Sequence, residues 1–262
     1  MIRNFHEFSK FKQTFSYLDI FRNSKIANSI QVIRLNFYIR AIITDNKNYE
    51  CVGKKQKMQG YIISLNRARD EDLVVTILSE SGLDTLYRFY GARHGVINLG
   101  FKIDFEIITN VKSTIGQLRD VLHIGYPWLT DHHKLRTWQQ FVTLFYPHLR
   151  EAEETDNFYF NLLDHAAENW SKQNPKRIAV EAYVKLLEHE GRLHKEMFCF
   201  FCDESITKDV SIIRSFLPAH PNCAHTLSIN QDGLNELFEN STTLFLSDKE
   251  VENLWLVLLE GI

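Results

Sequence analysis

The sequence lacks the features that mark secreted, membrane-spanning or nucleotide-hydrolysing proteins. Its 262 residues include four cysteines, too few for a disulfide scaffold, so a reducing cytosol is the expected compartment. No apolar run approaches the roughly 18 to 20 residues that a membrane span needs, and no secretory signal is evident at the N-terminus. Neither a GxxxxGK[ST] loop nor a GxSxG elbow occurs, so ATP hydrolysis and serine-hydrolase chemistry are not supported.

Positive charge is scarce outside the N-terminal segment. The net charge of -3 combines residues 1–57, with 11 Lys and Arg against 4 Asp and Glu, and residues 58–262, with 19 against 29. Within the second part, residues 58–125 are nearly neutral and residues 126–262 are acidic, with 12 against 21. Proteins that coat duplex DNA are usually basic. Any nucleic-acid contact must therefore come from a local patch.

Residues 1–57 differ in composition from the rest of the chain. They are rich in Lys, Asn, Phe and Ile and show no sustained hydrophobic period. We expect Met58 to be the natural start, with the upstream segment a misassigned or poorly ordered extension. The competing interpretation is a basic arm that adds phosphate contacts. Mass spectrometry of the endogenous N-terminus distinguishes the two, because a mature chain that starts near Met1 contradicts the first.

Short strands with tight connections dominate the stretch that follows. Apolar residues alternate with mixed ones, β-branched residues are dense, and Gly82 marks a turn. These features predict strands over 61–65, 73–78, 83–90, 101–109 and 117–123. Several short antiparallel strands at this spacing indicate a small barrel or sandwich.

The order of motifs in this stretch resembles RecO, the bacterial recombination mediator. Gly60 opens a strand just after Met58, a charged loop ends in Glu71-Asp72, and a turn glycine precedes Gly91-Ala92-Arg93. The resemblance covers about residues 58–262. It implies an α+β fold, with an OB-fold β-barrel over residues 58–125 and an α-helical domain over 126–262.

Cations and aromatic rings collect along the predicted barrel. In OB folds the connection between the first two strands flanks the ligand groove, and here it carries Arg67 and Arg69, two residues apart. Arg88 and Tyr90 are also two apart, on the predicted third strand. The candidate nucleic-acid-binding residues are Arg67, Arg69, Arg88, Tyr90, Arg93, His94 and Lys102.

Such a group suits a single strand, because cations follow the phosphates and rings, including Tyr87 and Phe89, stack on bases. The alternative interpretation is structural. In that case the aromatics belong to the core, and the arginines pair with nearby carboxylates. These carboxylates are Asp70, Glu71, Asp72 and Asp84.

From Tyr126 onward the hydrophobic period becomes helical. One helix is predicted over Thr130–Tyr146, with Thr130-Asp131 as its cap and Pro147 as its stop. A second follows an Asp156 cap and ends near Trp170, and a third runs from Pro175 to about Leu193. The last begins with the capping box Ser247–Glu250, with Gly261 as its C-cap.

A CxxC pair and an HxxC pair occur late in the chain. Cys199 and Cys202 are followed about twenty residues later by His220 and Cys223, with His225 as a spare donor. Three thiolates and one imidazole are a ligand set that zinc accepts. RecO relatives often carry two CxxC pairs here, so the resemblance adds to the prediction of a structural zinc knuckle at 199–225. The alternative is a pair of small buried thiols among phenylalanines.

Two metalloenzyme patterns fail on spacing. His189 and His194 are five residues apart, about 140° around a helix, so they do not form an HExxH pair. His194 and Glu196 precede the CxxC by only two residues, and no proline precedes Cys199, unlike in zinc deaminases. Neither pattern supports an enzyme, and the resemblance to RecO implies a non-enzymatic function.

The resemblance implies a DNA repair and recombination mediator. It would bind single- and double-stranded DNA, promote annealing of complementary strands, and help load RecA on gaps coated by single-strand-binding protein (SSB). Its expected partners are RecR, with RecF, SSB and RecA as further candidates, and its expected location is the cytoplasm, at the nucleoid. The alternative is a protein-interaction adaptor whose barrel binds a partner with little DNA contact. The acidic charge of residues 58–262 favours that alternative.

Overall fold

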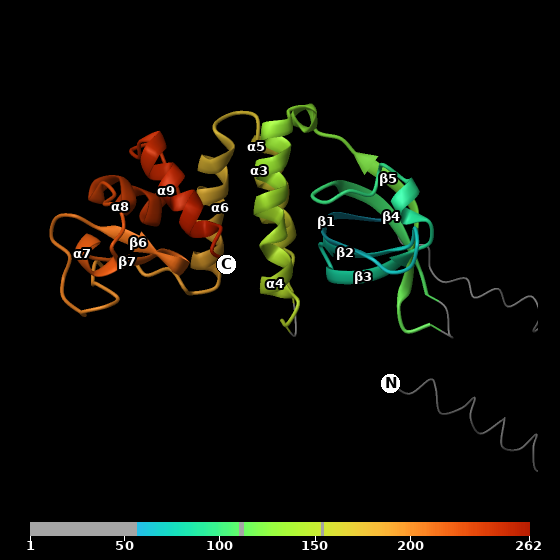
Figure 1. The fold of residues 1–262 in the computed structure, drawn as a ribbon, viewed down its shortest axis with the longest axis horizontal. Coiled ribbons are helices and arrows are strands. Elements are labelled where there is room, and N and C mark those ends of the chain that lie inside the picture. The colour runs from blue at the N-terminus through green and yellow to red at the C-terminus, as the bar shows by residue number, and fades with distance from the viewer. Residues whose placement is uncertain (1–56, 110–112, 153–154) are drawn as a thin grey trace, which may run out of the picture. The chain divides into compact units, whose positions relative to one another are not determined.

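Five strands close into a barrel, as Figure 1 shows in a computed structural model that describes residues 57–109, 113–152 and 155–262. The strands are β1 (Lys57–Arg67), β2 (Leu73–Ser79), β3 (Gly82–Arg88), β4 (Lys102–Ile108) and β5 (Gly116–Ile124). Their order around the barrel is β1-β2-β3-β5-β4, and β1 pairs with both β2 and β4 to close it. Helices follow, so the predicted α+β fold with an N-terminal barrel is confirmed.

Strand β1 is apolar on both faces because each face is covered. Ile62 points into the barrel core with Phe105, whereas Tyr61 and Ile63 pack in a second core with helical residues such as Trp138. All five side chains are almost fully buried. The run Tyr61–Ile63 therefore departs from the one-sided pattern of a half-exposed strand.

The third strand is shorter than predicted, and this changes how two candidate site residues are related. It ends at Arg88, and Tyr90 adopts a left-handed conformation with φ 53° just before the 3-10 turn η2 (Gly91–Arg93). The prediction that Arg88 and Tyr90 share a strand was therefore wrong. A left-handed residue breaks the extended geometry that the two-residue period requires.

The rest of the described chain is mainly helical (Figure 1). Two short strands pair antiparallel among the helices. In chain order the elements are η3 (Pro127–Thr130), α3 (His132–Thr143), α4 (Phe145–Leu149), α5 (Phe158–Asn169), α6 (Pro175–His189), β6 (Ser211–Ile213), η4 (Arg214–Phe216), β7 (Leu217–Ala219), α7 (Pro221–Ala224), α8 (Gln231–Asn240) and α9 (Asp248–Leu258).

Several predicted helix ends are confirmed. Asp131 caps α3 by accepting hydrogen bonds from the backbone of His133 and Lys134, and Pro175 is the first residue of α6. The capping box between Ser247 and Glu250 opens α9.

Three other predicted ends were wrong. Pro147 does not stop a helix, because α3 ends at Thr143 and Pro147 lies in the first turn of α4, where no N–H is needed. Helix α6 ends at His189, before Gly191 with φ 67°, rather than near Leu193. The C-cap of α9 is Leu259, not Gly261.

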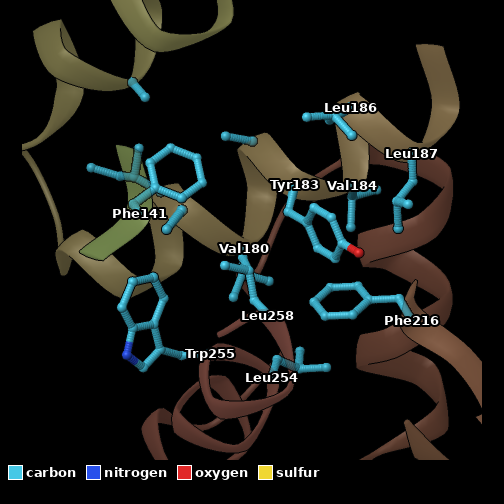
Figure 2. Close-up of a cluster of buried hydrophobic side chains, with 14 of the residues drawn as sticks. Phe141, Val180, Tyr183, Val184, Leu186, Leu187, Phe216, Leu254, Trp255 and Leu258 are labelled. Carbon is cyan, nitrogen blue, oxygen red and sulfur yellow. The ribbon is translucent and has the colours of Figure 1, made fainter. Parts of the chain in front are cut away.

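Helix α6 lies in the middle of the helical core. Figure 2 shows side chains from α6, including Val180 and Tyr183, facing Leu254 and Leu258 of α9 and Phe216. The Tyr183 and Phe216 rings meet edge to face, with centroids 4.7 Å apart. Helix α6 thus packs both against α9, the last helix, and against Phe216 of η4.

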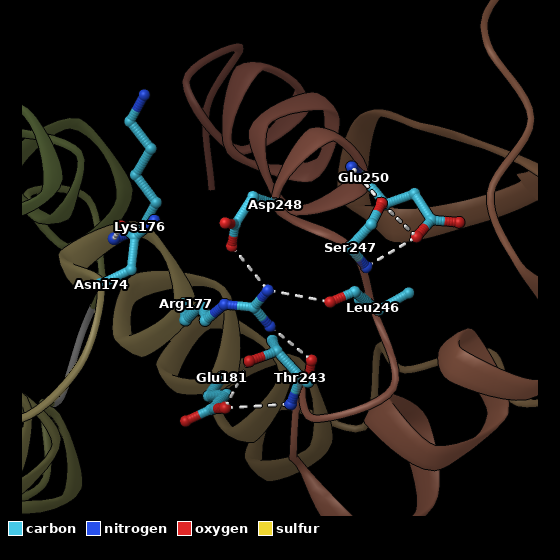
Figure 3. A network of polar contacts seen from close by, with 9 residues as sticks. All are labelled: Asn174, Lys176, Arg177, Glu181, Thr243, Leu246, Ser247, Asp248 and Glu250. Atoms are coloured by element: carbon cyan, nitrogen blue, oxygen red, sulfur yellow. Dashed lines mark hydrogen bonds and ion pairs between the residues drawn. The ribbon is translucent and has the colours of Figure 1, made fainter.

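A charged clamp fixes the segment between α8 and α9 (Figure 3). Arg177 of α6 donates to the carbonyl oxygens of Thr243 and Leu246 at 2.6 and 2.8 Å and to Asp248 at 2.7 Å. Glu181, one turn later, accepts from the backbone N–H and the hydroxyl of Thr243. The segment is thus held by side chains rather than by regular structure.

Replacing Arg177 by Met should lower the free energy of unfolding by about 2 to 4 kcal/mol, because partly buried carbonyls lose charged donors while the alkyl stem is kept. Urea denaturation measures this. The matched control is Lys176→Met, which removes an ion pair to a half-exposed Glu252 and should cost less than about 1 kcal/mol. Equal losses for the two variants would contradict the clamp.

The described residues belong to one compact unit spanning Lys54–Ile262. The expectation for the segment upstream of Met58 falls on residues that, apart from Lys57, lie outside the described part. The division into domains at 125 and 126 stays a prediction. Within the described ranges, no helix is long and apolar enough to cross a membrane.

Candidate nucleic-acid surface and candidate metal centre

A hollow of about 410 Å³ lies on the barrel between the end of β3 and β5. It brings together three of the seven predicted nucleic-acid-binding residues, Arg88, Tyr90 and His94, with Phe89, which was predicted as a stacking ring, and with two residues that were not predicted to bind. The additional lining residues are Phe89, Leu118 and Arg119. Arg119 was missed although it follows the buried Leu118 on a predicted strand, where alternation places it outward.

Arg88 is the half-buried cation of this hollow. Its Nη1 donates to the carbonyl oxygen of Leu118 at 2.9 Å. Among the described residues, none accepts a hydrogen bond from its buried Nε. Burial lowers the pKa of Arg88, and the nearby charge of Arg119 lowers it further, while Asp120 opposes the shift. Two guanidinium groups therefore lie close enough to repel each other, an arrangement that an anion would relieve.

Two exposed rings stand beside these guanidinium groups. Tyr90 is 59% exposed and Phe89 is 47% exposed. The backbone N–H of Tyr90 donates to Asp72 at 2.7 Å, and the hydroxyl of Tyr87 donates to the other oxygen of Asp72 at 2.6 Å. The Tyr87 hydrogen bond is the main reason that the pKa of Asp72 is lowered. Asp72 thus ties the β1–β2 connection to the left-handed turn at Tyr90.

Arg93 stacks over the ring of Tyr90, 5.2 Å from its centroid, and forms an ion pair with Glu71. The structural alternative is therefore confirmed in part, because one of the predicted arginines is paired. Arg67 and Arg69 are both exposed, but only Arg69 lies in the β1–β2 connection, because Arg67 is the last residue of β1 and pairs with Leu73. The structure places this connection next to the hollow through Asp72 and Glu71.

Lys102 lies apart from the other six predicted residues. Only 9% of it is exposed, and its ammonium forms an ion pair with Asp164 of α5 at 2.5 Å. It also faces the rings of Tyr61 and Phe160, at 5.7 and 5.4 Å. A buried lysine with a carboxylate partner has no free charge for a phosphate, so we leave it out of the proposed surface.

The four predicted metal ligands form a tight cluster. The ligand atoms of Cys199, Cys202, His220 and Cys223 all lie within 4.8 Å of one another. Nδ1 of His220 is 3.4 Å from Sγ of Cys202 and 4.0 Å from Sγ of Cys223. Tetrahedral zinc with usual bond lengths separates such atoms by about 3.5 to 3.8 Å. The cluster could therefore hold a metal ion with little movement.

Local backbone structure shapes this cluster. A turn after Cys199 is closed by the N–H of Asp203, which donates to the Cys199 carbonyl oxygen at 2.9 Å, and Asp203 has φ 57°. His220 lies just before Pro221, the first residue of α7, so Cys223 returns one turn later. The spare donor His225 is not a member of the cluster.

The chemistry of the donor set also fits a cation. Burial acts to raise the pKa of Cys199, but N–H groups of the backbone, including that of His220 at 3.3 Å, lower it to about 6. Burial and the neighbouring sulfurs of Cys199 and Cys202 raise the pKa of Cys223 to about 11. Three crowded sulfurs cannot all ionise without a compensating charge, which a divalent metal supplies.

Residues 58–129 match the family model described as RecO N terminal. Among curated proteins, none matches the chain. The matched residues contain β2 to β5, nearly all of β1, and the whole hollow, so the match and the closed barrel agree. The barrel region therefore matches the RecO N-terminal domain, which confirms the predicted resemblance over residues 58–129.

Proposed function

We propose that this chain is a non-enzymatic mediator of DNA repair and homologous recombination. It binds single- and double-stranded DNA through its barrel, promotes annealing of complementary strands, and helps load RecA on gaps coated by SSB. RecR is its first expected partner, with RecF, SSB and RecA as further partners. The match to the RecO N-terminal domain supports this assignment.

The observation that carries DNA binding is the grouping of cations and exposed rings on that domain. Arg88, Arg119, Phe89 and Tyr90 line the hollow, and the β1–β2 connection adjoins it, with Arg67 at the end of β1 and Arg69 in the connection itself. Nearly half of Phe89 and more than half of Tyr90 face solvent, so both rings are available for stacking. Such a patch binds a strand locally although the protein is acidic.

We further propose that Cys199, Cys202, His220 and Cys223 hold a structural zinc ion. Four protein ligands leave no open position for a catalytic water. The ion would fix the connection that runs from the end of α6 to α7. Beyond that, the chemistry it supplies is charge neutralisation of the thiolates.

Replacing both Arg67 and Arg69 by Ala should weaken binding to single-stranded DNA and flatten its salt dependence. Each phosphate contact contributes about 0.7 to the slope of log affinity against log salt, so the slope should fall by about 1.4. Fluorescence anisotropy over a salt series measures it. Arg136→Ala, an exposed arginine on α3, is the matched control. An unchanged slope in the double variant would remove these residues from the DNA surface.

The adaptor function remains the second candidate, because residues 58–262 carry 29 Asp and Glu against 19 Lys and Arg. In that case the barrel binds a protein surface and contacts DNA little. Retention of the full chain on single-stranded DNA at low salt separates the two functions. Failure to bind under those conditions would favour the adaptor.

A further inference from the structure

We propose that the hollow between β3 and β5 is a subsite for one unpaired nucleotide. Its base stacks on Phe89 beside Tyr90, and its phosphate lies between Arg88 and Arg119. This inference rests on the proposed DNA-binding function. It adds that the chain binds a strand with bases more tightly than a sugar-phosphate backbone without them. It also assigns a phosphate contact to Arg119 and makes Phe89 the ring on which the base stacks.

The size of the hollow suits such a unit. Its volume of about 410 Å³ falls within the range of about 300 to 1,000 Å³ that is typical of small-molecule sites. Its lining combines two guanidinium groups and an imidazole with two rings and Leu118. A nucleotide matches both kinds of lining group, since it joins an anionic phosphate to a flat aromatic base.

The phosphate position follows from the two arginines. Within the described residues, neither Arg88 nor Arg119 forms an ion pair with a carboxylate, although Asp120 lies near enough to influence Arg88. Arg119 donates to the neutral side chain of Gln117 at 3.1 Å. Two adjacent guanidinium groups suit a phosphate, which accepts hydrogen bonds from both.

The base position follows from the two rings. Phe89 meets the ring of Tyr87 edge to face, with centroids 4.9 Å apart, and this contact holds its orientation. Tyr90 is held by its N–H bond to Asp72 and by Arg93 over its ring. Rings that are already oriented lose less conformational entropy when a base stacks on them.

The strand must be unpaired for this contact. In a duplex each base face is covered by its neighbours, and turning one base outward costs a few kcal/mol. Stacking on Phe89 would gain about as much as that cost, so duplex DNA would use the cations and leave the ring uncovered. The subsite therefore predicts that Phe89 strengthens binding only when the DNA offers an unpaired base.

The test compares two oligomers of about 12 nucleotides, a length within the range of OB-fold site sizes. One is oligothymidylate, and the other has the same phosphates but abasic sugars throughout. We expect the full chain to bind the first between about five-fold and 100-fold more tightly, as measured by competition anisotropy. In Phe89→Ala this preference should fall to within about two-fold, because the variant lacks the stacking energy.

Arg119→Ala should behave differently. It should weaken binding of both oligomers by the same factor and reduce the salt slope by about 0.7. Phe89→Trp, which keeps a ring, should retain the preference for bases. Phe245→Ala, which removes a 62% exposed ring just before α9, is the matched control and should change neither oligomer.

The outcomes separate the subsite from the proposed function. If the wild-type chain binds both oligomers equally, or Phe89→Ala keeps the full preference, the subsite is wrong while DNA binding stands. If Phe89→Ala weakens duplex binding as much as oligothymidylate binding, the claim for an unpaired base is wrong. If the wild-type chain binds neither oligomer at low salt, both the subsite and the proposed DNA function are wrong.

Discussion

Replacing Cys199 by Ser is expected to reduce bound zinc from about one ion per chain to less than about 0.1. Cys199 is 1% exposed and receives hydrogen bonds that favour its thiolate, so it is the ligand best prepared for a metal. A serine hydroxyl stays protonated at neutral pH and does not replace a thiolate ligand. Elemental analysis of the purified full chain measures the change.

The loss should extend to the structure around the site. Cys199 belongs to the helical core together with Ile206, Val210 and Ile212, which lie on the connection that the four ligands close. Structural zinc sites contribute about 10 to 16 kcal/mol of apparent binding free energy in small domains. Hydrogen exchange should therefore show loss of protection over residues 197–213, whereas α5 and α6 should change little.

Two variants make this prediction specific. Cys51→Ser is the matched control, because it removes the one cysteine that is not a predicted ligand and should leave the zinc content unchanged. His225→Ala tests the spare donor and should also leave the zinc content unchanged. His220→Ala, which removes a predicted ligand, should lower it. Full zinc content in Cys199→Ser would contradict the ligand set, and protected exchange without zinc would favour the alternative of buried thiols.

The barrel and the metal cluster could be predicted because their signals are local. The dense β-branched residues around Ile62 and the CxxC spacing at Cys199 each lie within a few residues. Element types were correct wherever the period was sustained, as in α6 and α9. Helix α8 was missed, although an Asn230 cap precedes apolar residues at Leu234, Leu237 and Phe238.

The candidate site could not be predicted in full because its members meet through tertiary contacts. Nothing in the sequence separates Lys102 from Arg93, yet one is buried against Asp164 and the other is exposed beside Glu71. The left-handed turn at Tyr90 depends on Asp72, eighteen residues earlier. Local pattern predicts which strand carries a cation, and long-range pairing decides whether that cation is available.

Replacing Asp164 by Ala should lower the free energy of unfolding by about 3 kcal/mol, because Lys102 would keep a buried charge without its partner. Breaking buried pairs costs about 3 to 5 kcal/mol, and the lower end applies because the side chain of Asp164 is 28% exposed. The same carboxylate accepts from the hydroxyl of Tyr61 at 2.8 Å and from Tyr126 at 3.2 Å. Urea denaturation at neutral pH measures the loss.

The effect should depend on pH in one direction. Burial acts to raise the pKa of Asp164, but the hydrogen bonds from Lys102 and Tyr61 outweigh it, so the pKa is lowered on folding. A lowered pKa means that the unfolded chain binds the proton more readily. The contribution of the Asp164 carboxylate to the free energy of unfolding is therefore complete above the ordinary Asp pKa of about 3.9. It is lost as the pH falls below that value. The difference between wild type and Asp164→Ala should shrink in that acidic range.

A double variant at Lys102 and Asp164 tests whether this ion pair is structural or belongs to the DNA surface. Lys102→Met with Asp164→Leu removes both charges and should recover most of the stability lost in Asp164→Ala, because no buried charge is left unpaired. DNA affinity and its salt slope should be unchanged in that double variant, since the Lys102 ammonium is already bound to a carboxylate. A slope reduced by about 0.7 would instead return Lys102 to the phosphate contacts.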